Sequence, residues 1–255
     1  EKDGGRPRHR IIVMEHGYHG DTIGTMSVGE RGVFNQAYEP LLFDVARVPF
    51  PASGARQETL DALEALCKQP DTAAFIVEPL VLGAGGMLVY DAKTLASMHE
   101  ICAHHGVLFI ADEVMTAWGR TGTLLACEQA GIEPIFEAHW STDRARMFFH
   151  SSSYTANPLA CAAAAANLAI WREEPVLERI ADLAHRQTEW LVKLGQFCHF
   201  ENPRQSGTMA ALDLRTSGEG GYLDTLAPRL LAFFRERGLL LRPLGNTIYV
   251  MPPYC

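Results

Sequence analysis

Short apolar runs alternate with longer segments of helical spacing through the first two thirds of the chain. The runs at 10–15, 73–79 and 107–113 are short and rich in apolar residues, which predicts buried strands. Residues 59–69 and 91–106 repeat apolar side chains every three or four positions, which predicts amphipathic helices. This alternation indicates an α/β fold with a mostly parallel sheet sandwiched by helices.

Two more helices are predicted after these elements, and the pattern changes after the second of them. Asn157 and Pro158 predict the N-cap and first position of a helix, and the alanine run that follows suits a helix packed closely on all sides. A long amphipathic helix is expected over 175–195, ending at Gly195. A further helix over about 223–237 lies between short apolar runs, which indicates a small α+β unit.

The change of pattern predicts a domain boundary near Glu173. We expect a large domain over 1–173 and a small C-terminal domain over 174–255. The sequence contains no internal repeat and no low-complexity linker.

Composition and charge narrow the class of protein. The chain has 255 residues, 47% of them hydrophobic, a net charge of −8 and an isoelectric point near 5.7, which argues against a nucleic-acid or membrane-surface binder. No apolar run suggests a transmembrane helix, and the start of the chain is too polar for a signal peptide. Six scattered cysteines without a CxxC pair indicate neither a metal site nor a disulfide framework. We therefore expect a cytoplasmic protein with reduced thiols.

Acidic residues follow two of the predicted strands. Glu78 lies near the end of one, and Asp112 and Glu113 lie at the end of the next along the chain. Ligands of parallel α/β sheets bind at the carboxyl ends of strands, and a buried carboxylate there is costly unless a cation meets it. Asp112 is the main candidate for such a contact, whereas Glu78 is either functional or paired with Arg120.

Two glycine-rich loops follow the first two strands. The loop at 16–32 contains Tyr18, His19 and Asp21, and it either brings an aromatic ring against a ligand or forms an ordinary turn with a buried tyrosine. The loop at 77–87 lacks the spacing of a dinucleotide fingerprint. Neither loop alone distinguishes a binding site from a tight turn.

Two further features are compatible with anion binding. Thr155, in "SSSYTANP", lies directly before a predicted helix, where free N–H groups and the helix dipole attract anions, although plain capping explains the same residues. Arg242 ends a predicted apolar strand and suits a bidentate carboxylate contact, although an exposed structural arginine is the usual case.

The combination and order of these motifs are more specific than any one of them. "EP" with "GAGG", then "FIADEV", "GRTG" and "YTANPLACAAA" closely resemble the class III aminotransferases of fold type I, which use pyridoxal phosphate. The stretches "YHGDTIGTMSVG" and "RPLGNTIYVMPPY" resemble the branch of this family that acts in biotin synthesis. The resemblance extends over essentially the whole chain.

The resemblance implies roles for individual residues. Asp112 matches the aspartate that keeps the cofactor's pyridine nitrogen protonated, and Glu113 is expected to serve local structure. Tyr18 matches the aromatic residue beside the cofactor ring. The implied catalytic residues are Asp112 and Tyr18; the cofactor-binding residues are Tyr18, His19, Gly20, Asp112, Tyr154 and Thr155; and the substrate-binding residues are Tyr18, Ser153 and Arg242.

The resemblance also implies a reaction and partners. An amino group moves from S-adenosylmethionine to pyridoxal phosphate and then to 8-amino-7-oxononanoate, which gives 7,8-diaminononanoate. The implied assembly is a homodimer with shared active sites, in which Thr155 and Tyr154 contact the phosphate of the neighbouring subunit's cofactor. Free lysine is an alternative donor, and a class III enzyme acting on ω-amino acids or diamines is an alternative identity.

The sequence departs from the family pattern at its Schiff-base lysine. None of the four lysines, at positions 2, 68, 93 and 193, lies in a Ser-Lys-Gly-type loop, and Pro134 runs directly into Ile135 where that loop is expected. We expect segments to be missing there and before Glu1, and the small domain to be truncated. Either the chain is a lysine-less, non-enzymatic homologue, or it joins segments of a longer chain. We favour the second, because losing a central strand would leave sheet edges unpaired.

Overall fold

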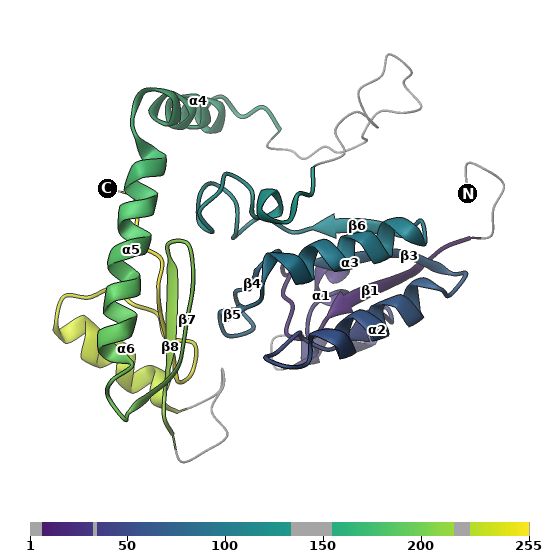
Figure 1. Cartoon of the computed structure of the whole chain (residues 1–255), viewed down its shortest axis with the longest axis horizontal. Helices are drawn as coiled ribbons and strands as arrows, with labels where there is room; N and C mark the ends of the chain where they lie inside the picture. Colours follow the sequence, from purple (N-terminus) through teal and green to yellow (C-terminus); the bar gives the residue numbers. More distant parts are fainter. Residues whose placement is uncertain (1–6, 33–34, 134–154, 217–224, 255) are drawn as a thin grey trace.

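The computed structural model describes residues 7–32, 35–133, 155–216 and 225–254 (Figure 1). The predicted Ser153 and Tyr154 lie outside these described residues. Four parallel strands form the N-terminal sheet in the order β2-β1-β3-β6. Their bounds are Arg10–Met14 for β1, Ala46–Val48 for β2, Thr72–Val77 for β3 and Leu108–Ala111 for β6. The predicted α/β class and parallel sheet are confirmed.

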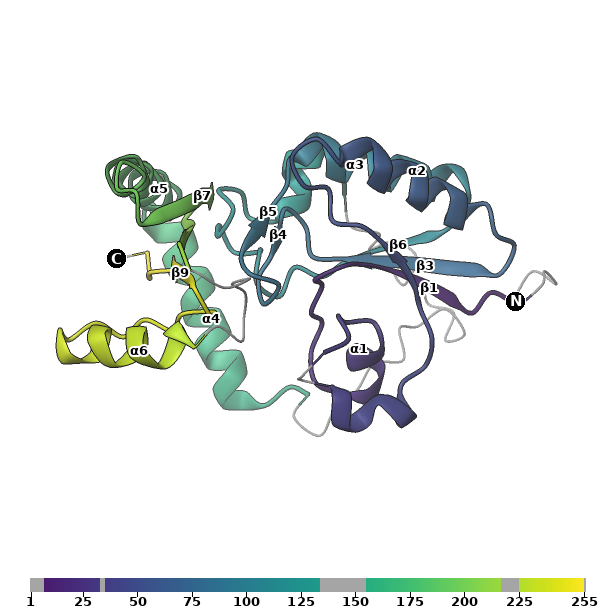
Figure 2. The ribbon, with the colours of Figure 1, turned by 90° about the horizontal axis from the view of Figure 1, so that it is seen from below.

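Two long helices cover one face of this sheet, and shorter helical turns lie on the other side (Figure 2). The covering helices are α2 (Arg56–Cys67) and α3 (Ala92–His104), and α1 (Ile23–Ser27) lies opposite them. Both predicted helices are confirmed, because their apolar stripes supply fully buried side chains such as Leu63 and Leu95 to the core.

The strand β6 is less buried than its sequence predicts. Phe109 packs edge-on against Phe75 of β3, but Leu108 is 64% exposed and Ile110 is 43% exposed. The prediction of a buried strand is therefore wrong for one face. The reason is position: in the described part of the chain, β6 ends the sheet, and α3 covers only one of its faces.

Short elements connect the strands. The turn-like helix η1 (Gln36–Leu41) precedes β2, and a small antiparallel hairpin of β4 (Val81–Leu82) and β5 (Leu88–Val89) follows β3. After β6, the 3-10 helix η2 (Ala126–Ala130) packs against α3.

A second, antiparallel sheet belongs to the C-terminal part, with the order β7-β8-β9. Its strands are Phe200–Ser206 (β7), Met209–Leu214 (β8) and Thr247–Val250 (β9), accompanied by the helices Val176–Leu194 (α5) and Leu226–Glu236 (α6). The helix Pro158–Glu173 (α4) precedes this part along the chain. The predicted helices that correspond to α4, α5 and α6 are all present.

Two details of this part contradict the sequence predictions. Residues 239–243 form no strand, so Arg242 does not end one; the edge of the sheet is supplied by β9 instead. The helix α4 has no buried residue, and its Leu159 is 81% exposed. Its alanine-rich surface therefore lacks the all-round packing that was expected, because few described residues lie against it.

Candidate functional site

Asp112 lies at the carboxyl end of β6 and is paired with a histidine. Its Oδ2 lies 2.7 Å from Nδ1 of His19, and its Oδ1 accepts a hydrogen bond of 3.2 Å from the backbone N–H of Val114. The side chain of His19 is 2% exposed and that of Asp112 is 17% exposed. The hydrogen bond with His19 holds the pKa of Asp112 below its usual value. The carboxylate is therefore ionised at neutral pH and fixed in orientation.

Three adjacent strand ends build this cluster. His19 follows β1 and Asp112 follows β6, and β3 lies between these two strands. Glu78 comes directly after β3. The parallel pairing of the strands brings all three ends to the same edge, which is where a ligand of such a sheet is expected.

Glu78 joins the two glycine-rich loops from a buried position. Its Oε1 accepts from the backbone N–H of Tyr18 at 2.9 Å, and its Oε2 accepts from that of Gly83 at 3.0 Å. Burial raises the pKa of Glu78, since its side chain is almost entirely shielded from water. These contacts hold the backbone that carries Tyr18 and His19 against the β3–β4 connection.

The two loops touch so closely that one of them requires glycine. A Cβ atom added at Gly85 would overlap the backbone carbonyl oxygen of His16. His16 itself has a left-handed φ of 66°, and Gly20 a φ of 118°. The backbone around Tyr18 and His19 is therefore held in a specific shape by its neighbours.

The alternative pairing of Glu78 with Arg120 is wrong. Arg120 donates from Nη1 to the carbonyl oxygen of Pro252 at 2.7 Å, and its guanidinium lies 4.6 Å from the ring centre of Tyr254. The role of Glu78 could not be predicted from the sequence, because its partners are backbone N–H groups, which leave no residue-type signal.

Tyr18 stands at the surface of this cluster. It is 41% exposed, so the expectation of a buried tyrosine in an ordinary turn is not met. Partial burial and a contact with Asp21 raise the pKa of its hydroxyl group. A partly exposed aromatic side chain, directly before His19 in the sequence, can contact a planar ligand.

Glu113 serves local structure, as expected. Its Oε2 accepts from the hydroxyl group of Thr116 at 2.8 Å and from the N–H of Ala126 at 2.9 Å. Its Oε1 accepts from the N–H of Cys127 at 2.8 Å. The carboxylate thus caps the start of η2 and leaves Asp112 as the acid that faces the site.

The remaining predicted residues lie on other elements. Thr155 precedes α4 and Arg242 follows α6, and both are exposed. The N-cap of α4 is Asn157, whose Oδ1 accepts from the N–H groups of Leu159 and Ala160 at 3.0 and 3.2 Å. Capping therefore accounts for this helix start within the chain, and neither Thr155 nor Arg242 belongs to the three strand ends.

The lysines in the described part of the chain also lie elsewhere. Lys68 pairs with Glu64 at 2.9 Å on α2, and the ammonium group of Lys193 lies 5.7 Å from the ring centre of Trp190 on α5. Lys93 is exposed in the first turn of α3.

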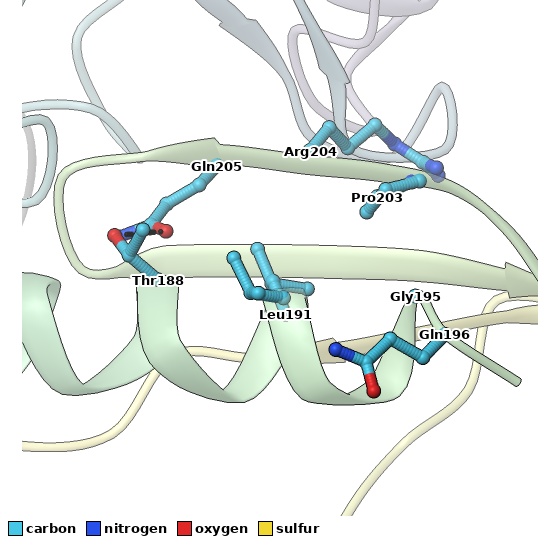
Figure 3. A pocket seen from close by; sticks show the side chains of 8 residues that line it. Thr188, Leu191, Gly195, Gln196, Pro203, Arg204 and Gln205 are labelled. Atoms are coloured by element: carbon cyan, nitrogen blue, oxygen red, sulfur yellow. Dashed lines mark hydrogen bonds between the residues drawn. The ribbon is translucent and has the colours of Figure 1, made fainter.

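A shallow groove of about 450 Å³ lies between α5 and β7 (Figure 3). Thr188 and Leu191 line it from the helix, and Pro203 and Gln205 line it from the strand. None of the predicted site residues contributes to it, so the candidate site remains the cluster at the strand ends.

The chain is similar in sequence to known aminotransferases. The family model described as "Aminotransferase class-III" matches residues 1–138 and 135–255 in two separate parts. The adenosylmethionine-8-amino-7-oxononanoate aminotransferase of Synechococcus elongatus is 40% identical over 98% of this chain, and that of Anoxybacillus flavithermus is 34% identical over 98%. The chain spans 66% and 64% of the lengths of these two relatives.

Solved structures share the fold. The adenosylmethionine-8-amino-7-oxononanoate aminotransferase of Methanocaldococcus jannaschii superposes with a TM-score of 0.83 at 28% identity, covering 99% of this chain and 65% of that one. A PLP-bound amine transaminase from an uncultivated Pseudomonas species gives a TM-score of 0.83 at 29% identity, covering 97% of this chain and 65% of that one. Both comparisons confirm the predicted fold type.

Proposed function

The chain belongs to the class III aminotransferases, and from that membership we propose that the protein transfers an amino group from S-adenosylmethionine to 8-amino-7-oxononanoate. The product is 7,8-diaminononanoate, an intermediate of biotin synthesis. Relatives from eight organisms, 27% to 40% identical to this chain, carry the name of this enzyme. The structural observation that supports the proposal is the His19–Asp112 pair at the carboxyl end of β6.

Class III aminotransferases use pyridoxal phosphate, and the described residues fit one end of that cofactor. When bound, the cofactor supplies an electron sink for the carbanion formed at the substrate carbon. Asp112 is a fixed, ionised carboxylate of the kind that holds a protonated ring nitrogen, and Tyr18 offers an aromatic contact beside it. The aldehyde end requires a lysine, and the three lysines in the described part of the chain, Lys68, Lys93 and Lys193, lie at the end of α2, on α3 and on α5 rather than in this cluster.

The residues of the chain have separate tasks in this proposal. His19 keeps Asp112 ionised and oriented, and Glu78 fixes the backbone that carries Tyr18. Following the family resemblance, Arg242 binds the substrate carboxylate.

The proposed assembly is a homodimer in the cytoplasm. Thr155 and Tyr154 bind the cofactor phosphate of the neighbouring subunit, and Ser153 borders the substrate. In the part of the chain that the structure describes, no helix is sufficiently long and apolar to cross a membrane.

Product formation tests the proposal. The chain is assayed with pyridoxal phosphate, S-adenosylmethionine and 8-amino-7-oxononanoate in two forms. One is the chain as it stands, and in the other the segment that we expect to be missing between Pro134 and Ile135 is supplied from the Synechococcus elongatus relative. We expect 7,8-diaminononanoate only from the inserted variant, detected by mass spectrometry. Adding Asp112→Asn should lower its rate by about 10²–10³-fold, the scale of removing one preorganised electrostatic contact.

The same assay separates the alternative functions. An inserted variant that binds cofactor but accepts only ω-amino acids or diamines as donors would identify a different class III enzyme. None of the four lysines lies in a Ser-Lys-Gly-type loop, which favours a second candidate function for the chain as it stands. In this second function the chain binds a ligand without transferring an amino group. An inserted variant that binds cofactor but transfers no amino group from any donor would support that candidate.

A further inference from the structure

The turn that leads into Tyr18 and His19 has an unusual backbone conformation. His16, two residues after the end of β1, has a left-handed φ of 66°, which residues other than glycine rarely adopt. Such a conformation costs energy and persists only where the surrounding structure holds it. The position of Tyr18 and His19 therefore depends on the groups that bind the backbone of residues 16–18.

Glu30 binds this turn through two hydrogen bonds. Its Oε2 accepts from the backbone N–H of His16 at 2.7 Å, and its own backbone N–H donates to the carbonyl oxygen of Gly17 at 2.7 Å. Because His16 lies beyond the end of β1, the carboxylate of Glu30 supplies the acceptor that a neighbouring strand would otherwise provide. Glu30 thus binds both a donor and an acceptor of the turn.

Glu30 and Glu78 accept hydrogen bonds from alternate residues of this segment. Glu30 accepts from the N–H of His16, and Glu78 accepts from that of Tyr18 at 2.9 Å. The two carboxylates come from different parts of the chain, since Glu30 follows α1 and Glu78 follows β3. The segment is therefore fixed at two points immediately before His19.

Arg47 of β2 fixes the position of Glu30 in turn. Its Nη2 donates to the carbonyl oxygen of Gly29 at 3.0 Å, and its Nη1 lies 3.9 Å from Oε2 of Glu30. That Nη1 is buried and has no hydrogen-bond partner among the described residues, so the carboxylate of Glu30 provides an opposite charge near it. The side-chain amide of Asn35 also donates to the carbonyl oxygen of Glu30 at 2.7 Å. A neighbouring strand and the following turn therefore hold Glu30 against the segment at 16–18.

We propose that Glu30 is a positioning residue, which holds the turn at 16–18 so that His19 meets Asp112 and Tyr18 stays partly exposed. Glu30 acts through the backbone of the turn rather than on a cofactor or substrate. The geometric part of the proposal stands on the contacts of this chain, whereas its consequence for amino transfer rests on the proposed function.

Hydrogen–deuterium exchange in the 255-residue chain tests the contact with the turn. Glu30→Ala removes the acceptor of the His16 N–H, whereas Glu30→Gln removes the charge but keeps a side-chain oxygen that accepts. We expect the amides at 16–19 to exchange at least about 10-fold faster in Glu30→Ala and to stay within about 3-fold in Glu30→Gln. Unchanged exchange at 16–19 in Glu30→Ala would overturn the proposal.

Two references show that the effect is local. The amides of α3 report on the intact fold, and their exchange should not change, because the half-exposed side chain of Glu30 fills no part of the core. Glu39→Ala, at an exposed position of η1, is the matched control and should leave the amides at 16–19 unchanged. Equal acceleration by Glu30→Ala and Glu39→Ala would contradict a specific role of Glu30.

The pKa of Asp112 gives a readout that a general loss of stability does not move. The hydrogen bond with His19 lowers this pKa, so Glu30→Ala should raise it toward its ordinary value, as measured by carbon NMR of the carboxyl group. Removing a negative charge by itself lowers the pKa of a neighbouring carboxyl group, so a rise identifies lost positioning. Glu30→Gln removes the same charge and should not raise the pKa. A pKa of Asp112 that does not rise in Glu30→Ala would contradict the proposal.

The consequence for amino transfer is measured in the variant that contains the supplied segment. Glu30→Ala should lower kcat by about 10–10²-fold, because small displacements of contact groups are that costly, and Glu30→Gln should keep most of the rate. The effects of Glu30→Ala and His19→Gln should not add, since both act through the contact with Asp112. Additive effects would contradict the proposed route through His19.

The two kinds of measurement separate this proposal from the proposed function. No product from the unaltered inserted variant, together with the expected changes in exchange and in the pKa of Asp112, would reject the function and leave the role of Glu30 standing. Product formed by Glu30→Ala at an unchanged rate, with unchanged exchange at 16–19, would reject the role of Glu30 and leave the function standing.

Discussion

The two adjacent carboxylates after β6, Asp112 and Glu113, accept hydrogen bonds from different donors. Glu113 accepts hydrogen bonds from three donors of the following turn and helix, and these bonds stabilise its negative charge within the fold. Asp112 receives one side-chain contact, from a buried histidine, and one backbone N–H. Its position at the strand end was predictable from the apolar run before it. Its partner was not, because His19 lies 93 positions earlier and meets Asp112 only through the strand order.

The contact between His19 and Asp112 predicts a dependence of stability on pH. The pKa of Asp112 is lowered in the folded chain relative to its ordinary value of about 3.9, so the folded state binds this proton less readily than the unfolded state. The stabilisation is present above about pH 4 and is lost as the pH falls through the folded pKa. Asp112→Asn should therefore flatten the change in unfolding free energy below about pH 4, measured by urea unfolding at a series of pH values. Equal slopes in both proteins would contradict the role of this contact.

The stability of the fold is expected to depend on both carboxylate oxygens of Glu78, each of which accepts one backbone N–H. In Glu78→Gln, one carboxylate oxygen that accepts a backbone N–H is replaced by an amide group that donates. Leaving one buried N–H unpaired should lower the unfolding free energy by about 1–3 kcal/mol, as measured by chemical denaturation. Glu100→Gln, at an exposed position of α3, is the matched control. A similar small change in both variants would show that the two loops are not held through Glu78.

At the scale of elements, the sequence was informative where hydrophobic periodicity is local. Local spacing of apolar residues predicts the strands β1, β3 and β6. It also predicts the helices α2, α3 and α5. The strand β7 was missed, because FENPRQS is largely polar and becomes a strand by pairing with β8. The exposure of α4 could not be predicted either, since burial depends on which other elements are present.

The helical layer over the sheet should carry much of the stability. Leu95 of α3 is fully buried, so Leu95→Ala should lower the unfolding free energy by about 2–5 kcal/mol. The same substitution at the exposed Leu159 of α4 should change it by less than about 0.5 kcal/mol. Thermal or urea unfolding measures both. A large loss at Leu159 would mean that the apolar face of α4 is already packed in the chain as it stands.

At the scale of the whole molecule, Arg204 connects the C-terminal sheet to the β4–β5 hairpin. Arg204 of β7 pairs with Asp213 of β8 at 2.8 Å, and it donates to the backbone carbonyl oxygens of Gly86 at 2.6 Å and Met87 at 2.8 Å. Both charged side chains are largely buried, at 14% and 15% exposed. The contact ties the β4–β5 hairpin, next to the candidate site, to the C-terminal sheet.

Removing this connection should loosen the hairpin. Arg204→Met leaves Asp213 without its cation and should lower the unfolding free energy by about 3–5 kcal/mol. Limited proteolysis should then cut the connection at 83–87 faster than in the unaltered chain. Arg172→Met, at an exposed arginine of α4, provides the control. Unchanged cleavage in Arg204→Met would show that the two parts are held together by other contacts.

The proposed function is tested most directly by locating the lysine that bonds to pyridoxal phosphate. The chain and its inserted variant are incubated with pyridoxal phosphate and reduced with borohydride, and the modified lysines are located by peptide mass spectrometry. We expect about one adduct per inserted chain, on the lysine of the inserted segment, and none in stoichiometric amount on Lys2, Lys68, Lys93 or Lys193. A stoichiometric adduct on one of these four lysines that disappears with Asp112→Asn would contradict this expectation.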